Sequence, residues 1–142
     1  MLTLDQANAI VAGALDEARR QNAKPLAVIV LDAGGHPIAF QREDGASLFR
    51  FDIARAKAMG ALGMGANTRD IAARAASNPT FFTTVAIATG GDLVLSPGGL
   101  LLRDSSGAII GAVGISGDTG DCDEMCAAAG MRAAGFSDGA AA

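Results

Sequence analysis

Hydrophobic residues recur along this chain with two different periods, which predict helices in some segments and strands in others. Between residues 4 and 22 they recur every three or four positions, and Thr3 and Gln6 form a capping box at the start of that segment. Short aliphatic runs between Gly, Pro and Asp predict buried strands instead. The two patterns predict helices over residues 4–22, 47–66, 68–76 and 121–134, and strands over 26–31, 36–42, 83–88, 93–95, 100–103 and 108–116.

The predicted strands are joined by tight turns, and this arrangement indicates the fold class. Residues 32–35 and 104–107 share the pattern Asp-x-x-Gly between aliphatic runs, which is typical of a hairpin turn. Helices that separate such hairpins predict an α+β fold, formed by a single domain with an antiparallel sheet. The domain is expected to cover residues 1–136, with residues 137–142 as a flexible C-terminal tail.

The composition of the 142 residues argues against several classes of protein. Half of the residues are apolar, which predicts a folded core, and the formal net charge of −4 argues against nucleic-acid binding. No apolar run is long enough to predict a membrane span, and the N-terminus lacks the basic and apolar regions of a secretory signal. We therefore expect a cytoplasmic protein that contacts neither nucleic acid nor membrane.

Two kinds of side chain could carry chemistry. His36 is the only histidine and follows the first Asp-x-x-Gly turn, where it could act as an acid or base, ligate iron, or only shape the turn. Cys122 and Cys126 lie one helical turn apart, which suits either a soft metal or packing in the core. Because no third soft ligand and no zinc-type spacing accompanies them, we expect no metal site.

A group of charged residues follows the second predicted strand. Arg42 and Lys57 could bind a carboxylate, and Asp44 or Asp52 could orient these cations. Ser116, at the end of the last predicted strand, could donate a hydrogen bond to a developing oxyanion. The alternative is that the charges form ion pairs or a solvated surface network without any ligand.

Several sequence motifs occur together, in order, from Leu2 to about Gly135. They are residues 2–7 (LTLDQA), 30–36 (VLDAGGH), 42–46 (REDGA), 52–58 (DIARAKA), 97–100 (PGGL) and 111–117 (GAVGISG), followed by Asp123. With these motifs the chain resembles the GlcG/HbpS-like family, a haem-binding-protein-like group that also includes the C-terminal domain of PduO-type proteins.

This resemblance implies both a fold and a function. The implied fold is profilin-like, with a five-stranded antiparallel sheet flanked by helices, and the implied assembly is a homo-oligomer. The implied function is the binding of a small molecule, with haem or another tetrapyrrole as the candidate ligand and cofactor. Of the candidate iron ligands only His36 lies in a family motif, and Arg42 or Lys57 would pair with a propionate.

Two other functions fit the same residues. One is an enzyme of the hydrolase, lyase or isomerase type that acts on a small carboxylate-bearing catabolite, with His36 as acid or base. The other is a structural or ligand-sensing oligomer without chemistry. The haem-binding and enzyme hypotheses both require the His36 ring to face the same cavity as Arg42 and Lys57.

Overall fold

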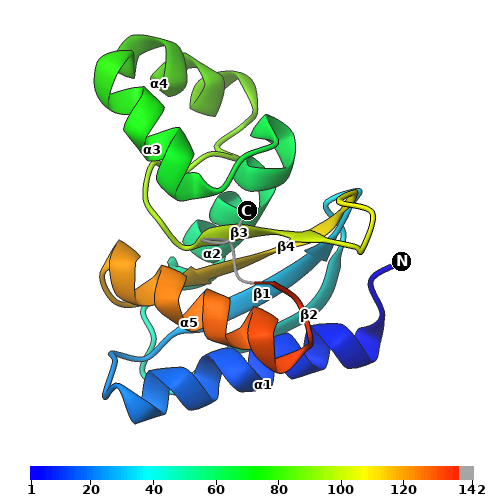
Figure 1. Cartoon of the computed structure of the whole chain (residues 1–142). Coiled ribbons are helices and arrows are strands. Elements are labelled where there is room, and N and C mark those ends of the chain that lie inside the picture. The colour runs from blue at the N-terminus through cyan, green and yellow to red at the C-terminus, as the bar shows by residue number, and fades with distance from the viewer. Residues whose placement is uncertain (138–142) are drawn as a thin grey trace.

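Four antiparallel strands form the sheet of this protein in a computed structural model that describes residues 1–137 (Figure 1). The order across the sheet is β2-β1-β4-β3, so β1 and β4 are central and β2 and β3 are edge strands. The strands are β1 (Ala27–Asp32), β2 (Pro37–Arg42), β3 (Gly99–Arg103) and β4 (Ile109–Ser116). The helices are α1 (Leu4–Arg20), α2 (Arg50–Met64), α3 (Thr68–Ser77), α4 (Pro79–Ala88) and α5 (Gly120–Ala133).

Helices cover both faces of the sheet (Figure 1). α1 and α5 pack together on one face, and α2 lies across the other, with α3 and α4 stacked beyond it. Alternate residues of β1 serve the two layers, because Val28 and Val30 join the core under α1 and α5, whereas Ile29 and Leu31 join the core under α2. The aliphatic run of β1 is therefore buried on both faces.

Glycines allow close approach between these layers. A Cβ atom at Gly114 of β4 would collide with the carbonyl oxygen of Ala54 in α2. A Cβ atom at Gly130 of α5 would collide with the carbonyl oxygen of Ile10 in α1. Because glycine has no Cβ, backbone packs directly against backbone at both places. This packing explains how a chain without Trp or Tyr builds a core from small residues.

The strand predicted for residues 83–88 is wrong, because these residues form most of α4. Their Thr, Val and Ile residues have a high strand propensity, on which the prediction was based. Pro79, however, stands at the start of a helix, where its fixed φ and missing N–H are suitable. The hydroxyl groups of Thr83 and Thr84 donate to the carbonyl oxygens of Pro79 and Phe81, which are one turn back along the helix.

The five-stranded sheet expected from the resemblance is likewise wrong for residues 1–137, in which the sheet has four strands. Residues 93–95 form no strand, because Leu93 packs with Ile71 and Phe82 in a small cluster between α3 and α4. The predicted α+β class and antiparallel sheet are confirmed. The profilin-like description stays a prediction.

The predicted helix starts are only partly confirmed. Thr3 and Gln6 form the expected capping box, and the Thr119 hydroxyl caps α5. The second helix begins later than predicted, at Arg50 rather than at residue 47, and the Ser47 hydroxyl accepts a hydrogen bond from the Arg50 side chain.

The remaining predictions about the whole chain concern its ends and its surroundings. The domain boundary at residue 136 stays a prediction, and the predicted tail, apart from Ser137, lies outside the described residues. Within residues 1–137, no helix has the length and apolar character needed to cross a membrane.

Candidate functional site

His36 lies at the tip of the β1–β2 hairpin. The Asp32 carboxylate closes the turn, since its Oδ1 atom accepts hydrogen bonds from the backbone N–H groups of Gly34 and His36, both at 2.9 Å. The same oxygen lies 3.2 Å from His36 Nδ1. The hydrogen bond from the His36 N–H, with that from Gly34, holds the pKa of Asp32 below its usual value. The carboxylate is therefore charged at neutral pH.

The contact with Asp32 fixes the tautomer of the neutral imidazole. An ionised carboxylate can only accept a hydrogen bond, so Nδ1 carries the proton and Nε2 keeps its lone pair. The side chain of His36 is 80% exposed, which leaves Nε2 accessible. Histidines that bind metals commonly donate their other ring N–H to a carboxylate in this way. The hairpin thus presents an oriented imidazole at the protein surface.

The side of β2 that faces α2 is only partly covered. α2 packs over β1, β4 and β3, whereas β2 is the edge strand beyond them. Phe40 pairs with Ile29, whose side chain faces α2, so Phe40 and, two residues further on, Arg42 point to that side. The Phe40 ring meets the Phe51 ring of α2 edge to face, with ring centroids 5.0 Å apart.

An apolar side chain of α2 also lies near the hairpin end of β2. At the hairpin tip a Cβ atom at Gly35 would meet the Met59 sulfur of α2, so the tip lies against that helix. Leu48 and Phe49, in the segment just before α2, are also exposed. We call the surface that comprises Phe40, Arg42, Phe51 and Met59 the α2–β2 strip.

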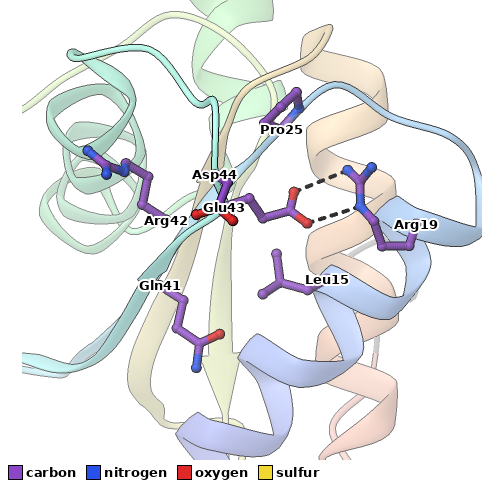
Figure 2. Close-up of a pocket in the computed structure, with 7 residues that line it drawn as sticks. All are labelled: Leu15, Arg19, Pro25, Gln41, Arg42, Glu43 and Asp44. Carbon is purple, nitrogen blue, oxygen red and sulfur yellow. Dashed lines mark hydrogen bonds and ion pairs between the residues drawn. The ribbon is translucent and has the colours of Figure 1, made fainter.

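A groove of about 410 Å³ lies on the other side of β2, next to α1 (Figure 2). Arg19 forms two bonds with the Glu43 carboxylate there, at 3.0 and 3.1 Å, and Glu43 also accepts from the Leu26 N–H. Arg42 borders the groove, but Figure 2 shows its guanidinium directed away from the Arg19–Glu43 pair. The groove is lined by Leu15, Arg19, Pro25, Gln41, Arg42, Glu43 and Asp44, and thus by neither His36 nor Lys57.

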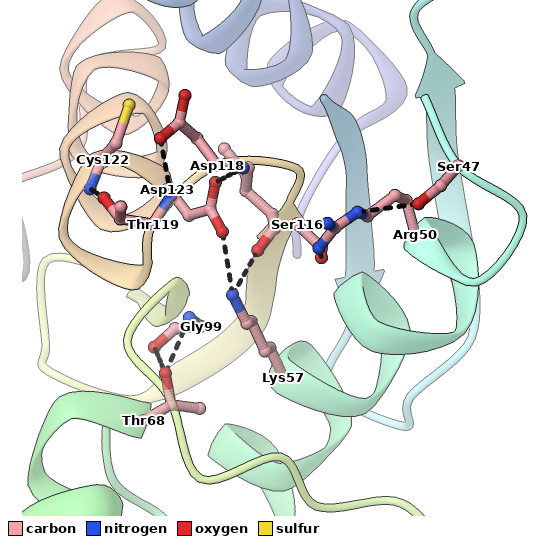
Figure 3. Close-up of polar contacts among 11 residues, drawn as sticks. Ser47, Arg50, Lys57, Thr68, Gly99, Ser116, Asp118, Thr119, Cys122 and Asp123 are labelled. Atoms are coloured by element: carbon pink, nitrogen blue, oxygen red, sulfur yellow. Dashed lines mark hydrogen bonds and ion pairs between the residues drawn. The ribbon is translucent and has the colours of Figure 1, made fainter. Parts of the chain in front are cut away.

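Lys57 is buried between α2, β4 and the start of α5 (Figure 3). Its ammonium group donates to the carbonyl oxygen of Ile115 at 2.9 Å and to Asp123 Oδ2 at 3.1 Å. The side chains of Lys57 and Asp123 are only 3% and 1% exposed. Asp123 Oδ1 accepts from the backbone N–H of Asp118. This ion pair therefore attaches the beginning of α5 to α2.

For both Lys57 and Asp123, burial and ion pairing shift the pKa in opposite directions. Burial lowers the pKa of Lys57 and raises the pKa of Asp123, because each ion loses its hydration. The attraction between the two groups opposes both pKa shifts. If either partner were removed, the other charge would stay buried without compensation.

Ser116 has a different partner from the one expected. Its hydroxyl is buried and accepts a hydrogen bond from the Arg50 guanidinium at 3.0 Å (Figure 3). Arg50 also donates to the Ser47 hydroxyl, so it links the loop before α2 to the end of β4. This contact holds two segments of the fold together.

The expected convergence of His36, Arg42 and Lys57 on one cavity is wrong for the single chain. His36 and Arg42 lie at opposite ends of β2, and Lys57 is buried beneath α2. Asp44 and Asp52 are exposed and do not orient Lys57, whose carboxylate partner is Asp123. The single chain therefore lacks the shared cavity that the haem-binding and enzyme hypotheses were both expected to use.

The burial of Lys57 had a signal in the sequence. Lys57 follows Ala54 by three positions and precedes Ala61 by four, which places it on the buried stripe of α2. A lysine on such a stripe needs a buried partner. Asp123 follows the last family motif, but 65 residues of intervening chain separate it from Lys57 and no local pattern marks the contact.

The two cysteines belong to the core side of α5. Cys126 is fully buried, and burial raises the pKa of its thiol to about 12. Burial also raises the pKa of Cys122, which is partly buried. Both side chains are therefore thiols rather than thiolates at neutral pH. In the described part of the chain, no group of three or more His, Cys, Asp or Glu residues is placed to hold a metal ion.

The fold and the hairpin define a small α+β protein that exposes an oriented imidazole beside an aromatic surface. Residues 2–132 match the model of a protein family described as "Haem degrading protein HbpS-like". The chain belongs to this HbpS-like family. Among curated proteins, none matches the chain in sequence.

Solved structures with the same fold agree with this membership. HbpS is 28% identical with a TM-score of 0.79, and the match covers 92% of this chain and 88% of HbpS. The Klebsiella pneumoniae protein ORFY is 26% identical with a TM-score of 0.84, and the match covers 93% and 89% of the two chains. A PduOC–haem complex is 24% identical with a TM-score of 0.86, over 96% and 97% of the two chains, and so supports the fold.

Proposed function

We propose that this protein binds haem or a related tetrapyrrole and that His36 ligates the iron. The observation that carries this proposal is the Asp32–His36 pair, which holds an imidazole with a free Nε2 at the surface of a chain of the HbpS-like family. The family description concerns haem, and one structure of the same fold is a haem complex. A bound haem would supply a redox-active iron at this hairpin.

The hairpin and the α2–β2 strip offer haem an open surface in place of the expected cavity, with His36 and Arg42 but without the buried Lys57. Imidazole is a common axial ligand of haem iron, and Asp32 provides the carboxylate that orients it. Phe40 and Phe51 offer aromatic surface for a flat macrocycle. Arg42 offers a guanidinium that can pair with a propionate. Phe40 and Arg42 lie on the edge strand β2 and Phe51 lies on the facing end of α2, where the side of β2 toward α2 is incompletely covered.

A haemin titration followed by visible absorption tests the proposal. We expect a saturable shift of the Soret band at one haemin per chain, which His36→Ala removes and Arg42→Ala weakens. Asp32→Asn is expected to weaken binding, because the amide no longer fixes the tautomer. The matched control is Asp104→Asn, since Asp104 makes the same turn bonds in the β3–β4 hairpin without a histidine. Binding unchanged by His36→Ala would contradict the assignment of the ligand.

As part of this proposed function, the chain assembles with copies of itself in the cytoplasm. Homo-oligomers are what the sequence resemblance implies, and an exposed His36 can be enclosed when copies meet. Light scattering of the purified protein tests the assembly, because it measures the mass of the particle in solution.

A further inference from the structure

The groove between α1 and β2 is a concave surface that is separate from the proposed haem site (Figure 2). It lies on the α1 side of β2, because Gln41 pairs with Val28, whose side chain joins the core under α1. Phe40 of the α2–β2 strip points to the opposite side of the same strand. The volume of about 410 Å³ falls in the range of roughly 300–1,000 Å³ that small-molecule sites have. The groove is therefore large enough for a ligand of its own.

One wall of the groove is an ion pair whose charges already satisfy each other. The Glu43 carboxylate accepts hydrogen bonds from Arg19 Nε and Nη2, at 3.0 and 3.1 Å, and from the backbone N–H of Leu26 at 2.8 Å. Arg19 Nη2 also donates to the carbonyl oxygen of Ala23 at 2.9 Å. The Glu43 side chain is only 18% exposed, so these bonds hold it in place. This wall is therefore preformed and has no net charge.

The other polar groups of the groove leave one negative charge without a partner. Figure 2 shows the Arg42 guanidinium directed away from the groove, so that it does not compensate Asp44 there. Within residues 1–137, no hydrogen bond or ion pair involves the side chain of Asp44 or that of Gln41. Both side chains line the groove and are exposed. The groove therefore presents a free carboxylate and a free amide.

We propose that this groove binds a small organic amine, whose ammonium group pairs with Asp44 and whose hydrocarbon part lies against Leu15 and Pro25. An ammonium group has only donors and an ionised carboxylate only accepts, so the two complement each other. The amide oxygen of Gln41 can accept a further hydrogen bond from the same amine. Leu15 and Pro25 supply the apolar surface that an aliphatic chain requires. This binding does not depend on haem.

Anions and metal ions fit this groove less well than an amine. An anion would have to displace Glu43 from Arg19, and the guanidinium of Arg42 points elsewhere. A metal ion would need several ligands, and nowhere in residues 1–137 are three or more His, Cys, Asp or Glu residues placed to hold one. The free charge of the groove therefore selects an organic cation.

Three probes with the same six-carbon chain test this selectivity. Hexylamine, hexanoate and hexanol differ only in the charge of the head group, and each is titrated into the haem-free protein. Nuclear magnetic resonance follows the backbone N–H signals of the chain during the titration. We expect saturable shifts at Gln41 and Asp44 with hexylamine. Its dissociation constant should be lower than those of hexanoate and hexanol by about fivefold or more.

Substitutions of Asp44 test its role in the groove. Asp44→Asn should weaken hexylamine binding by about fivefold or more, because the amide has no charge. Asp44→Lys should reverse the selectivity, so that hexanoate binds more tightly than hexylamine. The matched control is Asp16→Asn, since Asp16 is exposed on α1 but does not line the groove. Melting temperatures check that each variant is folded.

The same measurements can overturn the proposal. Equal affinities for the three probes, or no saturable binding of hexylamine, would contradict a cation site. Equal weakening by Asp44→Asn and Asp16→Asn would show a general effect of net charge instead of a contact. Shifts confined to Phe40 and Phe51 would place the chain on the α2–β2 strip and would also overturn the assignment. A failed haemin titration would refute haem binding but leave this result standing, because the probes are titrated without haem.

Discussion

The buried ion pair of Lys57 and Asp123 gives the sharpest prediction about this fold. Lys57→Met keeps the aliphatic stem of the side chain but removes its charge, and Asp123 is then left unpaired in a site where it is 1% exposed. Removal of one partner from a buried ion pair costs about 3–5 kcal/mol. For a domain of this size such a cost lowers the melting temperature by about 10 °C or more.

The pH dependence of the effect has a defined sign. Burial raises the pKa of Asp123, and Lys57 is the main group that opposes this rise. Without Lys57 the pKa of Asp123 rises further, so the carboxyl takes up a proton more easily in the folded state than in the unfolded state. A raised folded-state pKa gives stability that is present at low pH and is lost as the pH rises. The destabilisation by Lys57→Met should therefore be smaller at about pH 5 than at about pH 7.

Urea denaturation at both pH values measures this prediction. Adding Asp123→Asn to Lys57→Met should recover part of the stability, because the buried charge disappears while an acceptor for the Asp118 N–H stays. Arg42→Ala is the control, since loss of an exposed cation changes stability by about 0.5 kcal/mol or less. A cost below about 1 kcal/mol for Lys57→Met, or no recovery in the double variant, would refute the structural role of the pair.

Two further predictions concern the turn before α5 and the packing of the sheet. Asp118 accepts hydrogen bonds from the backbone N–H groups of Lys24 and Thr119, in that order of influence, and these lower its pKa. The charged Asp118 therefore stabilises the fold above the unfolded-state pKa of 3.8, and this stability is lost as the pH falls through the lower folded-state pKa. The difference in melting temperature between wild type and Asp118→Asn should consequently shrink at about pH 3. Gly114→Ala should cost about 3 kcal/mol or more in urea denaturation, because the added methyl group meets the backbone of α2. Gly63→Ala is its control, since a Cβ atom there meets nothing and should stabilise α2 by about 0.5–1 kcal/mol; equal effects of the two substitutions would contradict the close packing.

Local patterns predicted the parts of the fold that depend on neighbouring residues. The aliphatic run of β1 and the capping box at Thr3 are local features, and both appear in the structure as expected. α4 was mistaken for a strand, because strand propensity and the helix-starting position of Pro79 favour opposite assignments and only the folded chain decides between them. The wrong assignments of residues 83–88 and 93–95 also raised the predicted number of strands above the four that form.

The candidate site was harder to predict than the fold, because it depends on contacts between distant segments. The turn that holds His36 is local, and its Asp-x-x-Gly pattern predicted the hairpin in which the Asp32 contacts form. The partners of Lys57 and Ser116 come from α5 and from Arg50, and neither contact has a local signature. The sequence shows which side chains could carry chemistry, but only the folded structure shows which of these side chains contact one another.

The position of the iron tests the proposed function most directly. Crystals of the protein grown with haemin can be measured at the iron absorption edge, where the metal gives an anomalous signal. We predict an anomalous peak within coordination distance of His36 Nε2, with the porphyrin against Phe40 and Phe51. An ordered iron on any other surface of the protein would contradict the account of the hairpin as a haem ligand.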